Sequence, residues 1–278
     1  MAEGGRGPSL LPRGSPMGTT GLSPRLDLVF RTTLSLLLIP AATIVLSTCA
    51  LFRVLRGAPR SKIDSVYWTF GRFALRVGGT RLEVHGLENI HPGQGYVLVP
   101  NHESNWDPPA LLATLNGTPV RFVVKKEITG IPIFGWAIVQ SGSVRVERTG
   151  GQGDVDRIRE RMGTRPQDIS MLFYAEGTRS RDGALHPFKK GPFATAIAHR
   201  LPVLPVGHAG CYRIWDPRVF GIRSGPVVVQ VGRPIPAEHL EYDDREKLRD
   251  QTFDAVRELR TRARKRIREL GVDPGGID

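Results

Sequence analysis

A histidine and an aspartate five residues apart form the part of this sequence best suited to acid–base chemistry. His102 and Asp107 lie in a polar stretch, 101–107, between an apolar run that ends at Pro100 and a pair of prolines at 108–109. The apolar run predicts a buried strand and the prolines predict the first turn of a helix. A carboxylate within hydrogen-bond reach of one ring nitrogen fixes the tautomer of an imidazole and makes the other nitrogen a better base. The pair is therefore a candidate for removing a proton from an alcohol.

The local interpretation makes Asp107 the N-cap of a helix over 108–115 and places His102 at the open end of a strand over 96–100. The structural alternative is that His102 only caps the helix or donates to a carbonyl group. For an isolated pair with this spacing the structural alternative is the commoner one. Three polar clusters further along the chain favour the catalytic interpretation of the pair.

These clusters lie at or just beyond predicted strands: Lys125-Lys126-Glu127, Glu147-Arg148, and Glu176-Gly177-Thr178-Arg179-Ser180. Because the carboxyl ends of parallel strands meet at one edge of a sheet, we expect the clusters to share a crevice with His102. Taken singly, each has a plain explanation as a solvated strand edge, a surface arginine or a structural ion pair.

The chemistry of the clusters is complementary. Thr178 and Arg179, on a loop that contains Gly177, can bind a phosphate through hydroxyl, guanidinium and backbone N–H groups. Lys125 and Arg148 add positive charge beside them. Together the clusters predict an anionic substrate.

The elements that must position these residues alternate between short apolar runs and helical stretches. Strands are predicted at 81–85, 96–100, 121–124, 143–146, 169–174, 203–206 and 227–231. Helices are predicted at 108–115, 155–162 and 192–198, and an amphipathic helix over 243–270, whose arginines between 260 and 268 should face solvent or lipid. The pattern predicts an α/β fold in which a single domain, 81–278, has a central β-sheet flanked by helices.

In order and spacing these blocks resemble those of the glycerolipid acyltransferase family, typified by the PlsC-like 1-acylglycerol-3-phosphate acyltransferases. The matching residues are Asn101, His102 and Asp107; Lys125, Gly142 and Arg148; Tyr174 to Ser180; and Leu201 to Val206. The resemblance covers about residues 81–232. It departs from the family pattern at Tyr174 and Ala175, where phenylalanine and proline are usual.

The resemblance implies that His102 is the general base for the acceptor hydroxyl and that Asp107 orients it. It also implies that the acyl thioester, acyl-CoA or acyl carrier protein, is attacked directly, so no bound cofactor and no metal is expected. The implied acceptor is lysophosphatidic acid, giving phosphatidic acid in phospholipid biosynthesis, with another lysophospholipid or another lipid acceptor as the alternative. The implied substrate-binding residues are Glu176, Gly177, Thr178 and Arg179, with Lys125 and Arg148 as supporting cations.

A membrane segment is predicted ahead of the domain. Residues 32–52 carry no charge and are about long enough to cross a hydrocarbon layer of about 30 Å. We assign 25–80 to a membrane anchor with interfacial helices, and 1–24 to a disordered tail. Basic residues crowd the carboxyl side of the run, which predicts a cell-membrane protein with its catalytic domain on the cytoplasmic side. Whether the run spans the bilayer or lies in it stays open, as does a core-facing role for 67–76.

Composition leaves two other classes to weigh. The formal charge of +12, from 39 basic and 27 acidic residues, would also suit a membrane-tethered nucleic-acid-binding protein. The arginine clusters lack interleaved aromatic residues, so no nucleic-acid partner is expected. A metal-dependent hydrolase could use His102, Asp107 and Glu176 as ligands. Cys211 with His208 is a remote alternative pair, and oligomeric state is not predicted.

Overall fold

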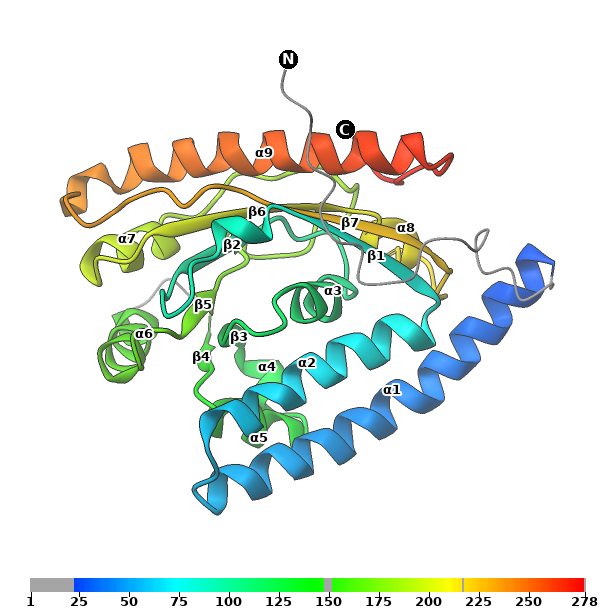
Figure 1. Cartoon of the computed structure of the whole chain (residues 1–278), viewed down its shortest axis with the longest axis horizontal. Coiled ribbons are helices and arrows are strands. Elements are labelled where there is room, and N and C mark those ends of the chain that lie inside the picture. The colour runs from blue at the N-terminus through cyan, green and yellow to red at the C-terminus, as the bar shows by residue number, and fades with distance from the viewer. Residues whose placement is uncertain (1–22, 148–151, 217, 278) are drawn as a thin grey trace.

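The computed structural model describes residues 23–147, 152–216 and 218–277. The predicted tail lies outside these ranges except for its last two residues, and Arg148 also lies outside them. The described chain forms one seven-stranded sheet covered by helices on both faces (Figure 1). The α/β architecture predicted from the sequence is therefore confirmed.

The seven predicted strands are all present, in the order β1-β7-β6-β2-β5-β3-β4. Their bounds are β1 (Thr80–His85), β2 (Val97–Pro100), β3 (Val120–Lys125), β4 (Val144–Val146), β5 (Ser170–Leu172), β6 (Val203–Ala209) and β7 (Gly225–Val231). The pair β6 and β7 is antiparallel, whereas every other neighbouring pair is parallel. Strands β2 to β6 thus run in one direction and end at the same edge of the sheet.

Central strand β2 is buried on both faces, which explains its continuous apolar sequence. Leu98 belongs to the core on the side of α3 (Asp107–Thr114), whereas Val97 and Val99 belong to the core on the side of α7 (Gly191–Ala198). Long helix α9 (Arg245–Glu269) covers β6 and β7 on this second face, opposite the layer that contains α3 (Figure 1). The remaining short helices are α4 (Lys126–Thr129), α5 (Phe134–Gln140), α6 (Gln152–Thr164) and α8 (Cys211–Ile214).

The arginines of α9 between 260 and 268 follow the prediction only in part, since Arg262 and Arg268 are exposed as predicted. Arg260 and Arg264 are buried rather than facing solvent or lipid. Arg260 donates to the carbonyl groups of Gly183 and Ile277, and Arg264 donates to that of Gly275 at 2.8 Å. These guanidinium groups fix the C-terminal segment against the helix, because each offers several donors to otherwise unpaired carbonyls.

The two N-terminal helices, α1 (Pro24–Leu55) and α2 (Arg60–Val77), form a layer outside α3 (Figure 1). The predicted segment 67–76 packs on α3, and the contact is close at Gly71. A Cβ there would lie 2.7 Å from the Pro109 oxygen and 2.8 Å from the Ala113 nitrogen. Glycine lets the two helices approach at this point.

Helix α1 is long and apolar enough to cross a bilayer, judged by length and composition. It nevertheless lies along the body of the protein and is bonded to it near its start. The Ile222 N–H donates to Thr32 Oγ1 at 3.0 Å, and Arg31 donates to the Val77 carbonyl at 3.2 Å. Its outward face is apolar and exposed, with Leu26, Val29, Phe30, Leu36, Leu37, Ile44, Val45, Phe52 and Leu55.

Candidate active site

The loop between β2 and α3 brings His102 and Asp107 together. His102 Nδ1 lies 2.7 Å from Asp107 Oδ2, and the same oxygen accepts the backbone N–H groups of Glu103 at 2.8 Å and Ser104 at 2.9 Å. Helix α3 begins at Asp107 with Trp106 in the cap position, so the predicted N-cap role of Asp107 is wrong. The carboxylate turns back to the loop because three donors converge there.

The ring of His102 is fixed on several sides. It stacks on the Tyr174 ring with centroids 3.7 Å apart and an angle of 18° between the planes. The His102 backbone N–H donates to Glu176 Oε1 at 2.6 Å, and its carbonyl accepts the Ser180 N–H at 2.8 Å. The loops after β2 and β5 are thus joined around the imidazole. Tyr174, one of the departures from the family pattern, keeps the aromatic surface that phenylalanine would offer.

The electrostatic surroundings keep His102 suited to act as a base. Burial lowers the pKa of His102, hydrogen bonding and charge at Asp107 oppose this, and His208 and Arg179 lower it further. The carboxylate partner assigns the proton to Nδ1, which leaves the lone pair on Nε2. At neutral pH the ring is therefore uncharged and able to accept a proton at Nε2.

A cavity of about 350 Å³ opens beside His102. This volume is in the range of ligand sites, about 300–1,000 Å³. The walls are largely apolar and come from α1, α2, the start of α3, β3, α5 and the loop after β5. Apolar wall residues include Leu46, Ala50, Val66, Phe70, Leu112, Phe122, Val124, Ile128, Phe134, Ala137 and Ile138.

Four of the predicted site residues line this one cavity, namely His102, Lys125, Thr178 and Arg179. His102 follows β2, Lys125 ends β3, and Thr178 and Arg179 follow β5, and the carboxyl ends of these parallel strands meet there. Asp107 lies behind His102 and is fully buried. Arg148 is outside the described residues, so its predicted role stays a prediction.

Glu176 and Gly177 are not among the described residues of the cavity wall. Glu176 Oε1 accepts from the His102 backbone and Oε2 from the His186 N–H at 3.0 Å, so its contacts hold loops together. Burial, opposed by these bonds, raises the pKa of Glu176 to about 8. Gly177 has φ +78°, and a Cβ there would lie 2.6 Å from the Lys189 side chain, so glycine permits the turn before Thr178.

Residues that sequence reasoning did not place at the site lie behind the dyad. Glu103 is buried, and its Oε1 accepts the Tyr212 N–H at 3.1 Å. His208 is held by Asn101, whose amide exchanges two hydrogen bonds with the His208 backbone at 2.9 and 3.1 Å. A histidine within the apolar run of β6 was the available signal, because a buried imidazole needs specific partners.

Ser104 has a structural role, since its Oγ donates to the Trp215 carbonyl at 2.8 Å and accepts the Trp106 N–H. The Cys211 thiol is fully buried, and burial together with Asp107 and Glu103 raises its pKa well above the ordinary value. Neither side chain is placed as a nucleophile.

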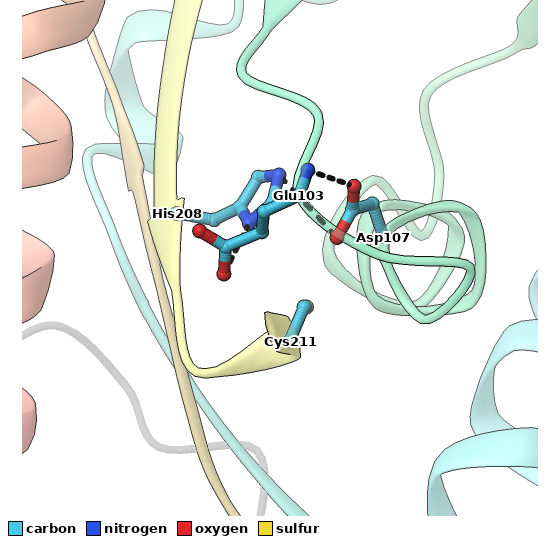
Figure 2. A group of neighbouring side chains, drawn as sticks. All are labelled: Glu103, Asp107, His208 and Cys211. Atoms are coloured by element: carbon cyan, nitrogen blue, oxygen red, sulfur yellow. Dashed lines mark hydrogen bonds and ion pairs between the residues drawn. The ribbon is translucent and has the colours of Figure 1, made fainter. Parts of the chain in front are cut away.

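One group of buried side chains has the residue types of a metal centre. Glu103, Asp107, His208 and Cys211 offer donor atoms within 4.8 Å of one another (Figure 2). Ligand atoms of tetrahedral zinc lie about 3.3–3.8 Å apart for bonds of 2.0–2.3 Å. His208 Nε2 is engaged with the Asn101 carbonyl at 2.9 Å, and Nδ1 lies on the side of Glu103, away from Asp107. The group does not fit a metal centre shared by all four residues.

Comparison with known proteins places this chain in a family. The model of the family described as Acyltransferase matches residues 81–209. A 1-acyl-sn-glycerol-3-phosphate acyltransferase of Pseudomonas aeruginosa is 31% identical over 218 residues, which are 76% of this chain and 81% of that protein. A chloroplastic 1-acyl-sn-glycerol-3-phosphate acyltransferase of Brassica napus is 36% identical over 157 residues, 56% of this chain. The chain spans 45% of the Brassica napus protein and 66% of a bovine relative.

A solved structure supports the fold. The crystal structure of the 1-acyl-sn-glycerophosphate acyltransferase PlsC from Thermotoga maritima superposes with a TM-score of 0.71. The match covers 85% of this chain and 98% of that one, at 24% sequence identity. The sheet and its covering helices are therefore shared with that protein.

Proposed function

This chain belongs to the PlsC-like acyltransferase family, and on that premise we propose that it transfers a fatty acyl chain from a thioester to the free hydroxyl of lysophosphatidic acid. One observation carries the proposal: a single, largely apolar cavity contains the imidazole of His102 together with Lys125, Thr178 and Arg179. Transfer of an acyl chain to a phosphorylated alcohol requires a base for the hydroxyl, cations for the phosphate and apolar walls for the acyl chain, all in one site.

The chemical step follows from the dyad. His102 Nε2 takes the proton of the acceptor hydroxyl, the oxygen attacks the thioester carbonyl, and the carbon–sulfur bond breaks in the resulting tetrahedral intermediate. Asp107 stabilises the imidazolium through its bond to Nδ1. A base placed in this way contributes about 10²- to 10⁴-fold. The thiolate leaves readily, because thiols ionise near a pKa of about 8.5, and it takes up the proton that Nε2 removed from the acceptor, so that His102 is neutral again.

The acceptor phosphate is assigned to Arg179 and Lys125. Guanidinium binds phosphate oxygens with two parallel N–H groups, and lysine adds a point charge. Thr178 supplies a hydroxyl beside them on the same wall. The alternative acceptor, a lysophospholipid with a larger headgroup, would use the same cations.

The apolar walls are assigned to acyl chains, and the donor to acyl-CoA or acyl carrier protein. Helix α1 supplies part of the wall through Thr43, Leu46, Ser47 and Ala50, while its opposite face is apolar and exposed. This arrangement supports a membrane association in which α1 lies against the body with its outer face in lipid. A lipid acceptor could then enter the cavity from the bilayer. We retain the cell membrane and its cytoplasmic side as the proposed location.

The decisive experiment uses full-length protein in anionic vesicles with labelled acyl-CoA and a panel of lysolipids. We expect phosphatidic acid from lysophosphatidic acid, loss of turnover in His102→Ala, and unchanged turnover in His239→Ala, a control at an exposed histidine. Turnover by His102→Ala at the wild-type rate would refute the proposal. In a flotation assay, wild-type protein that stays in the vesicle-free fraction would refute the membrane association.

A further inference from the structure

A second buried imidazole lies behind Asp107, on the side away from His102. His208 Nε2 is 3.9 Å from Asp107 Oδ1, and His208 Nδ1 is 3.9 Å from Glu103 Oε1 (Figure 2). The side chains of His208 and Asp107 are 0% exposed and that of Glu103 is 2% exposed. Imidazole and carboxylate thus alternate in the order His102, Asp107, His208, Glu103.

Hydrogen bonds fix one proton on the second ring. His208 Nε2 lies 2.9 Å from the Asn101 carbonyl oxygen, which can only accept, so Nε2 carries a hydrogen. The second ring nitrogen, Nδ1, is buried with no hydrogen-bond partner among the described residues, as are Glu103 Oε2 and Asp107 Oδ1. In a neutral ring the Nδ1 lone pair would face a carboxylate in a site of low dielectric constant. A second proton on the ring turns this repulsion into attraction.

We propose that His208 is a positioning residue of the transfer reaction: as an imidazolium it bridges Glu103 and Asp107, and so keeps the Asp107 carboxylate ionised and directed at His102. This inference rests on the proposed acyl transfer. Glu103 has the complementary task of holding the second proton on His208. Together with the base, the unit therefore has four members instead of the two of the sequence motif.

Charged and titratable groups surround this unit on several elements. On α8, the Cys211 thiol remains neutral because burial raises its pKa well above the ordinary value. Burial raises the pKa of Glu103, and the charge of Asp107 adds to this, whereas His208 and, from α9, Arg260 oppose it. Glu176, in the loop after β5, has its own pKa raised to about 8 by burial.

His102 is affected by the same charge. The positive charge of His208 lowers the pKa of His102, in the same direction as burial and Arg179, and against Asp107. Removing that charge should therefore let His102 take up a proton more readily. The acid limb of the pH profile would then move to higher pH.

Two variants separate this role from a structural one. His208→Gln keeps a donor for the Asn101 carbonyl but cannot carry a charge. Glu103→Gln keeps the shape and the acceptor for Tyr212 but removes the charge that retains the second proton. The matched control is His85→Gln on the outer strand β1, where a histidine also pairs with a carboxylate, Glu83, at 2.8 Å.

The measurement is kcat/KM for acyl transfer to lysophosphatidic acid between pH 5 and 9, with the thermal midpoint as a folding check. We expect the acid limb of both variants to move up by about one pH unit, the size of a single nearby charge effect. Activity should then fall about tenfold on the acid side of the limb, and recover at high pH. The control should keep the wild-type profile.

An unchanged limb in a folded variant, or an equal loss at every pH, would overturn the role of His208. If His208→Gln does not fold, Glu103→Gln carries the test. If the wild-type protein transfers no acyl group to any lysolipid, the proposed function fails. The inference is then tested by NMR titration of His102 in histidine-labelled protein, where equal pKa values in wild type and Glu103→Gln would overturn it.

Discussion

Replacing Asp107 by asparagine should be far less damaging than replacing it by alanine, and the reason lies in the loop backbone. Asp107 Oδ2 accepts two backbone N–H groups, from Glu103 and Ser104, besides the imidazole of His102. In asparagine the amide oxygen must occupy this position, because the NH₂ group would meet two donors. The oxygen therefore still faces His102 Nδ1, and the correct tautomer is retained.

The size of the effect follows from the hydrogen bonds that remain in each variant. A hydrogen bond to a charged group contributes about 1.5–3 kcal/mol and a neutral one about 0.5–1.5 kcal/mol. Losing the charge alone should cost about 1–2 kcal/mol of transition-state stabilisation, or about 5- to 30-fold in kcat. Alanine removes all three bonds and leaves the developing imidazolium unpaired, at about 3–5 kcal/mol, or about 10²- to 10⁴-fold.

The assay is single-turnover transfer from labelled acyl-CoA to lysophosphatidic acid in vesicles, for wild type, Asp107→Asn and Asp107→Ala. Asp250→Asn, an exposed aspartate paired with Arg249 on α9, is the matched control. Equal losses in the two Asp107 variants would refute the argument that the backbone sets the amide orientation. A loss of about 10⁴-fold in Asp107→Asn would mean that the amide nitrogen faces the ring and imposes the wrong tautomer.

Further predictions concern substrate binding, packing and pH. Arg179→Ala should raise KM about 10- to 100-fold for lysophosphatidic acid but leave KM for monoacylglycerol nearly unchanged, since one charged hydrogen bond contributes about 1.5–3 kcal/mol; equal effects on both acceptors would contradict the phosphate assignment. Gly71→Ala should destabilise the fold by about 1–3 kcal/mol in denaturant unfolding because its Cβ meets α3, whereas Gly163→Ala, with open space around it, should not destabilise it. The acid limb of wild-type kcat/KM should fall below pH 6.5, because burial lowers the pKa of His102, and a limb above 6.5 would contradict this. The proton on Glu176, whose pKa is raised to about 8, stabilises the fold fully below the ordinary value of 4.5, and this contribution is lost as the pH rises through 8. The free energy of unfolding should therefore decrease less between pH 6 and pH 9 in Glu176→Gln than in wild type. An equal decrease would refute the raised pKa of Glu176.

The strands could be predicted from the sequence because each is a short apolar run between turn residues. β6 continues beyond the predicted 203–206 to Ala209, because Gly207 and His208 interrupt the apolar pattern but pair with β7. The antiparallel direction of β7 depends on contacts between distant segments and left no local signal. Helices α4 and α5 also had no periodic pattern that predicted them.

The site was predictable to the extent that parallel strands end at one edge. His102, Lys125 and Arg179 are far apart in sequence, and the order of β2, β5 and β3 brings them to one cavity. The part that could not be predicted consists of groups without a motif. The position of Glu103 and His208 beside Asp107 became visible only when α3 and β6 enclosed Asp107, since it depends on burial and not on spacing, although the histidine in β6 was itself a signal.

The anchoring of α1 has a consequence for how the protein is made. Thr32 bonds to Ile222 and Asp27 to Ser224, contacts that join residues 190 and 197 positions apart. Helix α1 must therefore wait until residues 222–224 have been synthesised before these bonds can form. Until then its apolar surface must be covered by something other than the folded domain, and a nearby bilayer would cover it. Synthesis of the protein and its association with the membrane would then be a single process, and its last folding step would also complete the wall of the cavity beside His102.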